Sequence, residues 1–280
     1  MMEYDPKSGE YRLVRPRRSP PRLQTILFAL TVLSTMIVGG VSYGVSLIAI
    51  LLTHEMGHYL MARRHKIPAT LPYFLPMPFT IFGTFGALIK MDGRWATRKQ
   101  LFDVGIAGPL AGTVVAIPVS MIGIALSEAV PEAAVSGGFL NLGDSILFAS
   151  LTHLVAGPLP EGNTLILHPV AFAGWAGLFV TALNLLPIGQ LDGGHVVYGL
   201  FGPKASRISL VTLIAFGLLT VFVSPGWLLL VLLLLYFGYR HPPAREEHED
   251  LDRTRNWLGF ATLVLFVLTF TPVPISYNMP

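Results

Sequence analysis

The sequence contains no cysteine and few charged residues. Without cysteine there is no disulfide framework and no thiolate metal site, so a metal would have to be held by histidine, aspartate or glutamate. Only 12% of the 280 residues are charged, whereas a soluble domain averages roughly 25%. This shortage is too large for a water-facing surface, and 52% of the residues are hydrophobic. The composition therefore predicts an integral membrane protein.

Long apolar stretches recur along the chain. A helix needs about 20 residues to cross a bilayer, and most of these stretches are close to that length. They predict an all-α polytopic integral membrane protein with about six to seven transmembrane helices. The sixth stretch is short, and the sequence Ser224-Pro225-Gly226 predicts a tight turn before it. The stretches are residues 23–43, 45–62, 102–127, 169–186, 208–223, 227–239 and 257–271.

The basic residues are confined to one side of the predicted membrane. All 19 Lys and Arg residues fall within the segments 1–22, 63–101, 187–207 and 240–256, and none occurs in residues 128–168 or after residue 271. Because cytoplasmic loops carry an excess of Lys and Arg, we expect the N-terminus and the active site on the cytoplasmic side and the C-terminus outside.

These boundaries predict the organisation of the chain. Residues 1–22 are expected to be a basic cytoplasmic segment that anchors to the bilayer, not a nucleic-acid-binding arm or a cleavable signal peptide. Residues 23–272 are expected to be one membrane domain with its core at 45–205, and residues 273–280 a non-cytoplasmic tail.

The segment 67–91 does not fit a simple loop between the second and third stretches. Its prolines forbid a helix, while its aromatic and β-branched residues favour extended strands. Both of its ends are predicted to be cytoplasmic, yet it is apolar. A re-entrant β-hairpin that dips into the bundle explains this, because irregular backbone is tolerated at membrane depth only where protein or a cavity covers it. An interfacial loop on the membrane surface is the alternative.

The second stretch contains the sequence His54-Glu55-Met56-Gly57-His58. Positions i and i+4 of a helix lie on one face, so the two imidazoles can reach one metal ion. Glu55 lies beside them with a carboxylate free to deprotonate a water molecule at that metal. Chance, or a core histidine satisfied by a hydrogen bond, is the alternative. Ionisable groups in an apolar helix cost about 2.5–3.5 kcal/mol for each charge, so three together favour a metal site.

A catalytic zinc usually has three protein ligands, so a third must come from elsewhere in the chain. Pro187 and neighbouring glycines are expected to break the fourth helix near its cytoplasmic end, where the histidine pair should lie. Asp192 can then turn inward from an unwound segment, unless it is a solvated aspartate at the helix end. His195 is the rival third ligand. Asp103 is expected to be a surface charge at a helix N-terminus.

Together these motifs resemble the site-2 proteases, intramembrane zinc metalloproteases with a helix-borne HExxH motif and a distant LDG motif. Leu191-Asp192-Gly193 matches the second motif, and residues 184–187 resemble the NxxP element of the family. Residues 107–112 resemble its third-span motif, with a glycine where many members carry an asparagine. Residues 174–194 are most similar to the chloroplast EGY-type branch and its prokaryotic relatives. The resemblance runs from about residue 45 to 205.

The resemblance implies an intramembrane-cleaving zinc metalloendopeptidase. One Zn²⁺ ion would be held by His54, His58 and Asp192, with Glu55 as the general base. Asn184 would position the substrate or stabilise the developing oxyanion. The expected partners are the lipid bilayer and single-span membrane proteins, cut within or near their transmembrane segments, and no nucleic acid is expected.

The family also has a re-entrant β segment between its second and third spans, which supports that interpretation of residues 67–91. A helical amide is shielded by its own hydrogen bonds, so a substrate helix must unwind before it is cut. A strand of regular alternation over residues 84–91, with Gly86 within it, is expected to contact the unwound substrate by edge pairing.

Two other functions are possible on the sequence. A metal or ion transporter would carry repeated halves and ionisable residues spread along several spans, whereas here they are concentrated at one depth. An inactive protease-like binder of membrane helices would usually lack a ligand or the glutamate, and all four residues are present here.

Overall fold

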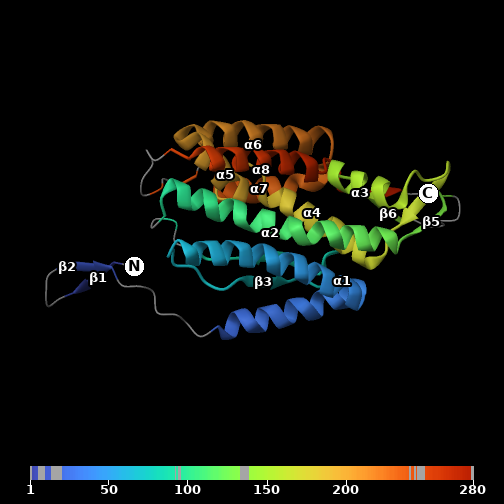
Figure 1. The fold of residues 1–280 in the computed structure, drawn as a ribbon, viewed down its shortest axis with the longest axis horizontal. Coiled ribbons are helices and arrows are strands. Elements are labelled where there is room, and N and C mark those ends of the chain that lie inside the picture. Colours follow the sequence, from blue (N-terminus) through green and yellow to red (C-terminus); the bar gives the residue numbers. More distant parts are fainter. Residues whose placement is uncertain are drawn as a thin grey trace.

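The computed structural model describes residues 2–5, 10–13, 21–91, 93, 96–132, 139–239, 241–242, 244 and 250–278. Within them the chain is mostly helical, and the helices run side by side along the long axis of the molecule (Figure 1). Of the expected basic segment 1–22, residues 1, 6–9 and 14–20 lie outside the described residues. Its described part includes two strands, β1 (Met2–Asp5) and β2 (Glu10–Leu13), which pair antiparallel.

Three helical stretches of the described chain are long and apolar enough to cross a membrane. They are α1 (Arg22–Arg64), α2 (Arg98–Ala125) and the run Asp192–Phe222, which joins α5 (Asp192–Phe201) to α6 (Ala205–Phe222). Shorter apolar helices are α3 (Ile146–Ala156), α4 (Pro169–Asn184) and α7 (Leu228–Phe237), and α8 (Arg253–Thr269) ends the bundle. The helical class predicted from the sequence is confirmed.

The helix α1 turns back on itself at Gly40 and so forms two arms (Figure 1). Gly40 has a φ of 82°, a left-handed conformation that glycine adopts at little steric cost. Next to the turn the two arms are in contact, since a Cβ on Gly44 would lie 2.7 Å from the side chain of Met36. They correspond to the first two predicted spans. The predicted spans were separated at residue 44, but the helix breaks at Gly40. The turn is made by the backbone conformation of a glycine and not by a polar residue.

A β-hairpin lies between the two arms of α1 (Figure 1). Its strands β3 (Tyr73–Pro76) and β4 (Thr84–Leu88) pair antiparallel. The hydroxyl of Ser34, in the first arm, donates a hydrogen bond to the carbonyl oxygen of Gly83 at 2.6 Å. The hydroxyl of Tyr43, in the second arm, donates to the carbonyl oxygen of Phe82 at 3.1 Å. Both arms therefore hold the tip of the hairpin.

The alternation expected through residues 84–91 is wrong at Gly86. Phe74 lies opposite Ala87 and Pro76 lies opposite Thr84, so β4 has one more residue than β3 in this interval. Gly86 has a φ of 88°, which a bulge of this kind requires. The strand ends at Leu88. The bulge reverses the side-chain parity of everything that follows it.

Stacked aromatic rings attach the hairpin tip to the rest of the bundle. Phe82 stacks on Trp175 and Phe179 of α4, with ring centroids 6.2 and 5.9 Å apart. Phe179 in turn contacts Trp227, which stacks on Phe270 just after α8. Such pairs contribute about 0.5–1.5 kcal/mol each beyond their burial. The hairpin is therefore tied to helices that lie far from it in the sequence.

Asp103 is buried in an ion-pair network and is not the surface charge that the sequence predicted. Asp103 is only 8% exposed. Arg255 of α8 donates from Nε and Nη2 to the two carboxylate oxygens, each at 2.7 Å. His65 Nε2 lies 2.9 Å from one of these oxygens. This bidentate pairing attaches α8 to α2.

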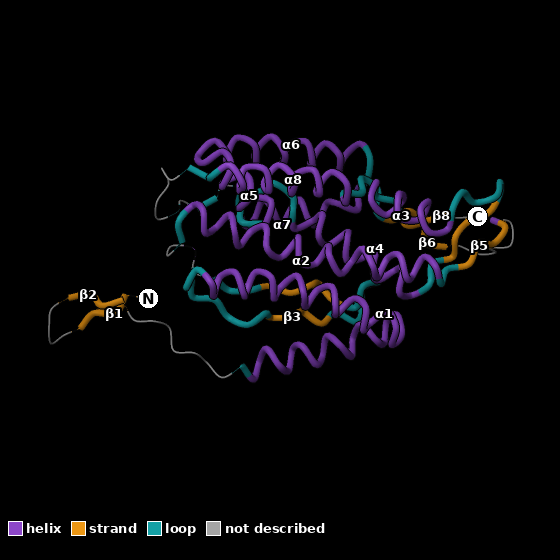
Figure 2. Tube along the Cα trace, in the orientation of Figure 1, coloured by secondary structure: helices purple, strands orange, loops and turns teal. Residues whose placement is uncertain are grey.

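The segment 128–168, which lies between two predicted helices and carries no Lys or Arg, contains α3 and short strands at the far end of the bundle (Figure 2). Here β5 (Glu128–Pro131) pairs with β7 (Asn163–Ile166), and β6 (Phe139–Leu142) pairs with β8 (Ile275–Asn278). The predicted C-terminal tail is therefore a strand in its described part, and residues 279–280 lie outside the described residues.

Candidate active site

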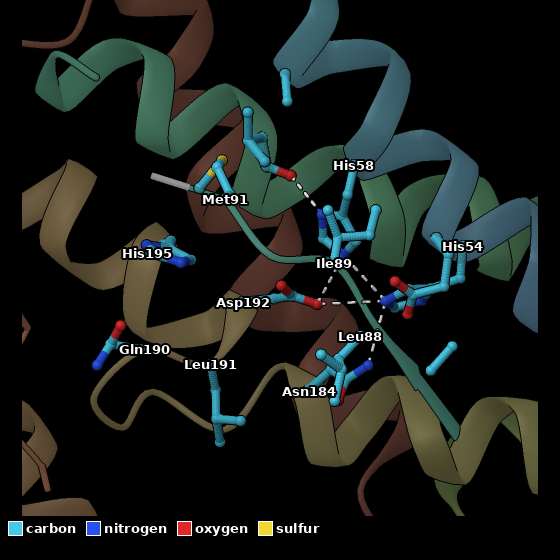
Figure 3. Close-up of a pocket in the computed structure, with 14 residues that line it drawn as sticks. His54, His58, Leu88, Ile89, Met91, Asn184, Gln190, Leu191, Asp192 and His195 are labelled. Carbon is cyan, nitrogen blue, oxygen red and sulfur yellow. Dashed lines mark hydrogen bonds and ion pairs between the residues drawn. The ribbon is translucent and has the colours of Figure 1, made fainter. Parts of the chain in front are cut away.

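Three side chains from distant parts of the chain converge between α1 and α5. His54 and His58 lie on the second arm of α1, and Asp192 is the first residue of α5. The two Nε2 atoms are 3.2 Å apart, and Asp192 Oδ2 lies 3.3 and 3.1 Å from them. Figure 3 shows the three side chains pointing toward one another. Among the described residues they form the one group whose ligand atoms all lie within 4.8 Å.

A backbone carbonyl sets the proton position on His58. Its Nδ1 lies 2.8 Å from the carbonyl oxygen of Val104 in α2. A carbonyl oxygen can only accept, so Nδ1 carries the proton and the neutral ring offers the lone pair of Nε2 to the group. Metal-binding histidines commonly donate their second nitrogen to a carbonyl in this way.

The spacing of the three donor atoms fits zinc. Bonds of about 2.0–2.2 Å in a tetrahedral site place neighbouring ligand atoms about 3.3 Å apart. The three separations here, 3.1 to 3.3 Å, agree with that value. Two imidazoles and one carboxylate leave a fourth position open, as in catalytic rather than structural zinc sites.

Glycines of α2 let the histidines approach it. An added Cβ on Gly108 would lie 2.0 Å from His58 Nε2, and one on Gly112 would lie 3.1 Å from His54 Nδ1. In the opposite direction, a Cβ on Gly57 of α1 would lie 2.5 Å from the carbonyl oxygen of Ala107. The backbone of α2 therefore contacts the backbone and the imidazole rings of α1. Only glycines, which have no side chain, permit the two helices to lie so close together.

The break after α4 brings Asp192 to the histidines. α4 ends at Asn184, and α5 begins at Asp192, so Asp192 opens a helix and does not lie on the unwound segment that the sequence predicted. A Cβ on Gly193 would lie 2.0 Å from the carbonyl oxygen of Leu185, and one on Gly194 would lie 2.2 Å from that of Gly189. The paired glycines after Asp192 thus allow α5 to start directly against the preceding turn.

Two further predicted residues line the same pocket. Glu55 is 6% exposed and lies beside the three-residue group without belonging to it. Asn184 Nδ2 lies 3.2 Å from His54 Nε2, so its amide points at the group from the end of α4 (Figure 3).

His195 lines the pocket but stands outside the three-residue group. Its Nδ1 lies 2.7 Å from Nε2 of His241, a residue of the segment between α7 and α8. The geometry favours Asp192 over His195 as the third ligand. The sequence did not predict the contact between His241 and His195, because His241 lies 46 positions away and belongs to no motif.

The pocket is an open cavity of about 200 Å³. Its lining includes Ala87 to Ile89, at and just after the end of β4, and Gln190 to Asp192 with His195. A helix with its side chains is about 10–12 Å wide. A cavity of this size therefore accommodates an extended backbone rather than a helix.

The fold and the site together define a helical, membrane-type protein with a buried His-His-Asp metal centre. A comparison with protein families agrees, since peptidase family M50, the family of the site-2 proteases, matches residues 42–223. The chain belongs to this family. The resemblance seen in the sequence motifs is confirmed, and zinc is the metal that this membership and the three-residue group imply.

Curated relatives include proteins of the EGY branch. The chain is 34% identical over 245 residues to "Probable zinc metalloprotease EGY1, chloroplastic" of Arabidopsis thaliana, covering 83% of this chain and 42% of that protein. It is 32% identical over 249 residues to the EGY1 protein of Oryza sativa subsp. japonica, covering 84% and 40%. For the EGY2 protein of Oryza sativa subsp. indica the identity is 30% over 268 residues, covering 93% and 48%. The chain thus spans less than half the length of these relatives.

The close contact at Gly108 makes a specific prediction. Gly108→Ala places a methyl group where His58 Nε2 lies, so the ring must move away and the purified protein should lose most of its zinc, measured as zinc per chain by mass spectrometry. The control is Gly217→Ala in α6, where an added Cβ meets nothing within 4 Å and zinc content should stay at the wild-type level. Full zinc occupancy in Gly108→Ala would contradict the site.

Proposed function

We propose that the chain is an intramembrane zinc metalloendopeptidase that cleaves peptide bonds within or near the transmembrane segments of membrane-anchored proteins. The observation that carries this proposal is the convergence of His54, His58 and Asp192 at zinc-ligand spacing, with Glu55 beside them and outside the ligand group. A carboxylate that is not needed for the metal is available for proton transfer.

In this proposal His54, His58 and Asp192 hold the metal. Zinc, when bound, supplies Lewis-acid chemistry that polarises a carbonyl and makes water nucleophilic at neutral pH. Glu55 accepts the proton of the water that attacks the scissile carbonyl carbon. It then transfers this proton to the leaving amide nitrogen, so that the products are a carboxylic acid and an amine, which ionise to a carboxylate and an ammonium.

Asn184 is assigned to the substrate in the same proposal. Its amide nitrogen lies at the edge of the group, 3.2 Å from His54 Nε2. With that imidazole engaged by the metal, the amide N–H is free to donate to the carbonyl oxygen of the substrate. A donor aimed at the oxygen on which charge develops lowers the barrier, by about 2.7–4 kcal/mol in a well-studied protease.

The proposed substrates are single-span membrane proteins in locally unwound form. An extended backbone fits the cavity, and β4 forms one of its walls. The edge of β4 that pairs with no strand among the described residues is proposed to add the substrate as a further strand, with the bulge at Gly86 setting where the pairing begins. The hairpin would then act at membrane depth, covered by the two arms of α1, as re-entrant backbone must be.

For the membrane topology we propose six to seven helical crossings with the N-terminus and the active site on the cytoplasmic side. The distribution of all 19 Lys and Arg residues supports this orientation. Membership of a peptidase family does not favour the transporter, and the presence of all three ligands and Glu55 argues against an inactive binder.

The role of Glu55 can be separated from metal binding. Glu55→Gln should keep about one zinc per chain and lower cleavage of single-span peptides in detergent by about 10²–10⁴-fold, because the base is lost and the ligands remain. Asp192→Ala should lose both zinc and activity. If Glu55→Gln lost its zinc, Glu55 would be a ligand and the assignment would be wrong.

The substrate-strand hypothesis is tested at the bulge. Gly86→Ala meets no atom within 4 Å but must adopt a φ of 88°, so it strains the bulge without a clash. Gly162→Ala is the matched control, since it has a φ of 75° and equal space, far from the pocket. Both variants should lose similar thermal stability, and only Gly86→Ala should also lose kcat/KM. Equal kcat/KM in the two would remove the support for strand pairing.

The orientation is open to labelling, because the native chain has no cysteine. A single cysteine in place of the exposed Glu161 should react with a membrane-impermeant thiol reagent added to intact cells that express the chain in their plasma membrane. One in place of the exposed Lys204 should react only after the cells are opened. The reverse pattern would invert the topology.

A further inference from the structure

His195 and His241 form a pair at the edge of the pocket that the proposed mechanism does not use. His195 lies on α5, one turn beyond Asp192, and Figure 3 shows its ring beside the Asp192 carboxylate. His241 comes from the segment between α7 and α8, beyond the residues that the family comparison matches. A segment outside the family match therefore contacts a residue that lines the cavity.

The hydrogen bonds of this pair fix the positions of its protons. His241 Nδ1 lies 2.6 Å from the carbonyl oxygen of Pro242, which can only accept, so Nδ1 carries a proton. In a neutral ring Nε2 of His241 is then bare. It lies 2.7 Å from Nδ1 of His195, which must therefore donate. Neutral His195 is left with an unprotonated Nε2.

The surroundings of His241 keep it neutral and in place. Burial lowers the pKa of His241, which disfavours a second proton on its ring. The ring stacks on Tyr198 of α5 with centroids 4.1 Å apart and planes 7° from parallel. The same segment is held by a hydrogen bond from the backbone N–H of Ala244 to the Tyr198 hydroxyl at 2.9 Å. If His241 carried protons on both nitrogens, its Nε2 would donate to Nδ1 of His195 instead of accepting from it. The burial of His241 opposes that state.

We propose that His195 presents its bare Nε2 to the cavity as a hydrogen-bond acceptor for a backbone N–H of the unwound substrate, and that His241 is the positioning residue that holds it in this tautomer. This inference rests on the proposed protease function. It assigns substrate recognition to a side chain of α5 that lines the same cavity as the end of β4.

The chemistry of the cavity indicates why the ligand is an N–H. An extended strand displays N–H and C=O groups along both edges, and β4 can pair with only one of them. Asn184 supplies a donor for a carbonyl on the remaining side, so an acceptor is needed for the N–H groups. A helical substrate has its N–H groups already bonded. A fixed acceptor at His195 therefore favours the unwound form of the same segment.

The tautomer is measured directly, without cleavage. In the full-length, zinc-loaded chain in detergent, ¹⁵N NMR of labelled histidine should show His195, assigned with His195→Asn, with a protonated Nδ1 and a bare Nε2. His241→Phe keeps the stacking on Tyr198 and removes the acceptor, and should yield a mixture of tautomers. A protonated Nε2 in the wild type would overturn the proposal.

Kinetics test the positioning role. His241→Phe should lower kcat about 10–100-fold, taking as a guide the range for removing a partner that orients a metal-bound histidine. Zinc content should remain unchanged, and His241→Gln, whose amide oxygen can accept from His195, should recover part of the loss. Tyr198→Phe, which keeps the ring stack and loses the hydroxyl, should stay within about twofold of the wild type. Unchanged kcat in His241→Phe, or loss of zinc in His195→Asn, would overturn the proposal.

The contact with the substrate is tested by a double-mutant cycle. A single-span peptide that the wild type cleaves is methylated at one backbone nitrogen at a time near the cut. One position should lower kcat/KM strongly in the wild type and hardly at all in His195→Ala, whereas positions that pair with β4 should be equally sensitive in both. If no position couples to His195, the acceptor role fails. If the wild type cleaves no peptide, the protease proposal fails, and the NMR result still decides the tautomer.

Discussion

The site depends on how closely α2 lies against the second arm of α1. Gly57 on α1, with Gly108 and Gly112 on α2, removes the side chains that would hold the helices apart. This contact places the carbonyl of Val104 within hydrogen-bond distance of His58 and so sets the proton of that ring. In an apolar bundle, where polar groups are costly unless they are bonded, backbone contact between helices also supplies the orientation of the donor side chains.

Much of the site follows from short-range regularities. The helical period alone places His54 and His58 on one face, and a proline with glycines after the fourth apolar run predicts the break that precedes Asp192. The requirement of zinc for a third ligand then links the two segments. The predicted helical stretches coincide with observed helices, because apolar length is a strong signal in a chain with so few charges. The shorter helices α3 and α5 fall outside those stretches.

What escaped prediction is set by contacts between residues distant in the chain or by single backbone angles. Asp103 was expected at the surface, and only Arg255, 152 positions later, explains its burial. The reversal at Gly40 and the bulge at Gly86 each depend on one positive φ. The sequence does not indicate which glycines of an apolar run adopt a positive φ. His241 was missed for the first reason. The glycines of α2, spaced three or four residues apart on one helical face, were a readable signal of the close packing.

The distance in sequence between the metal ligands has a consequence for biosynthesis. His58 and Asp192 are 134 positions apart, and His241 follows 46 positions after His195. A chain emerging from the ribosome forms its N-terminal parts first. While only α1 has been made, it offers two ligands, one fewer than catalytic zinc sites use. Under the proposed function, the nascent chain would have no competent centre while its earlier helices are being made, and would not cut neighbouring proteins at the insertion machinery. The ligand group is complete only after α5 has joined α1, and the His195–His241 pair forms only after the segment beyond α7 has followed.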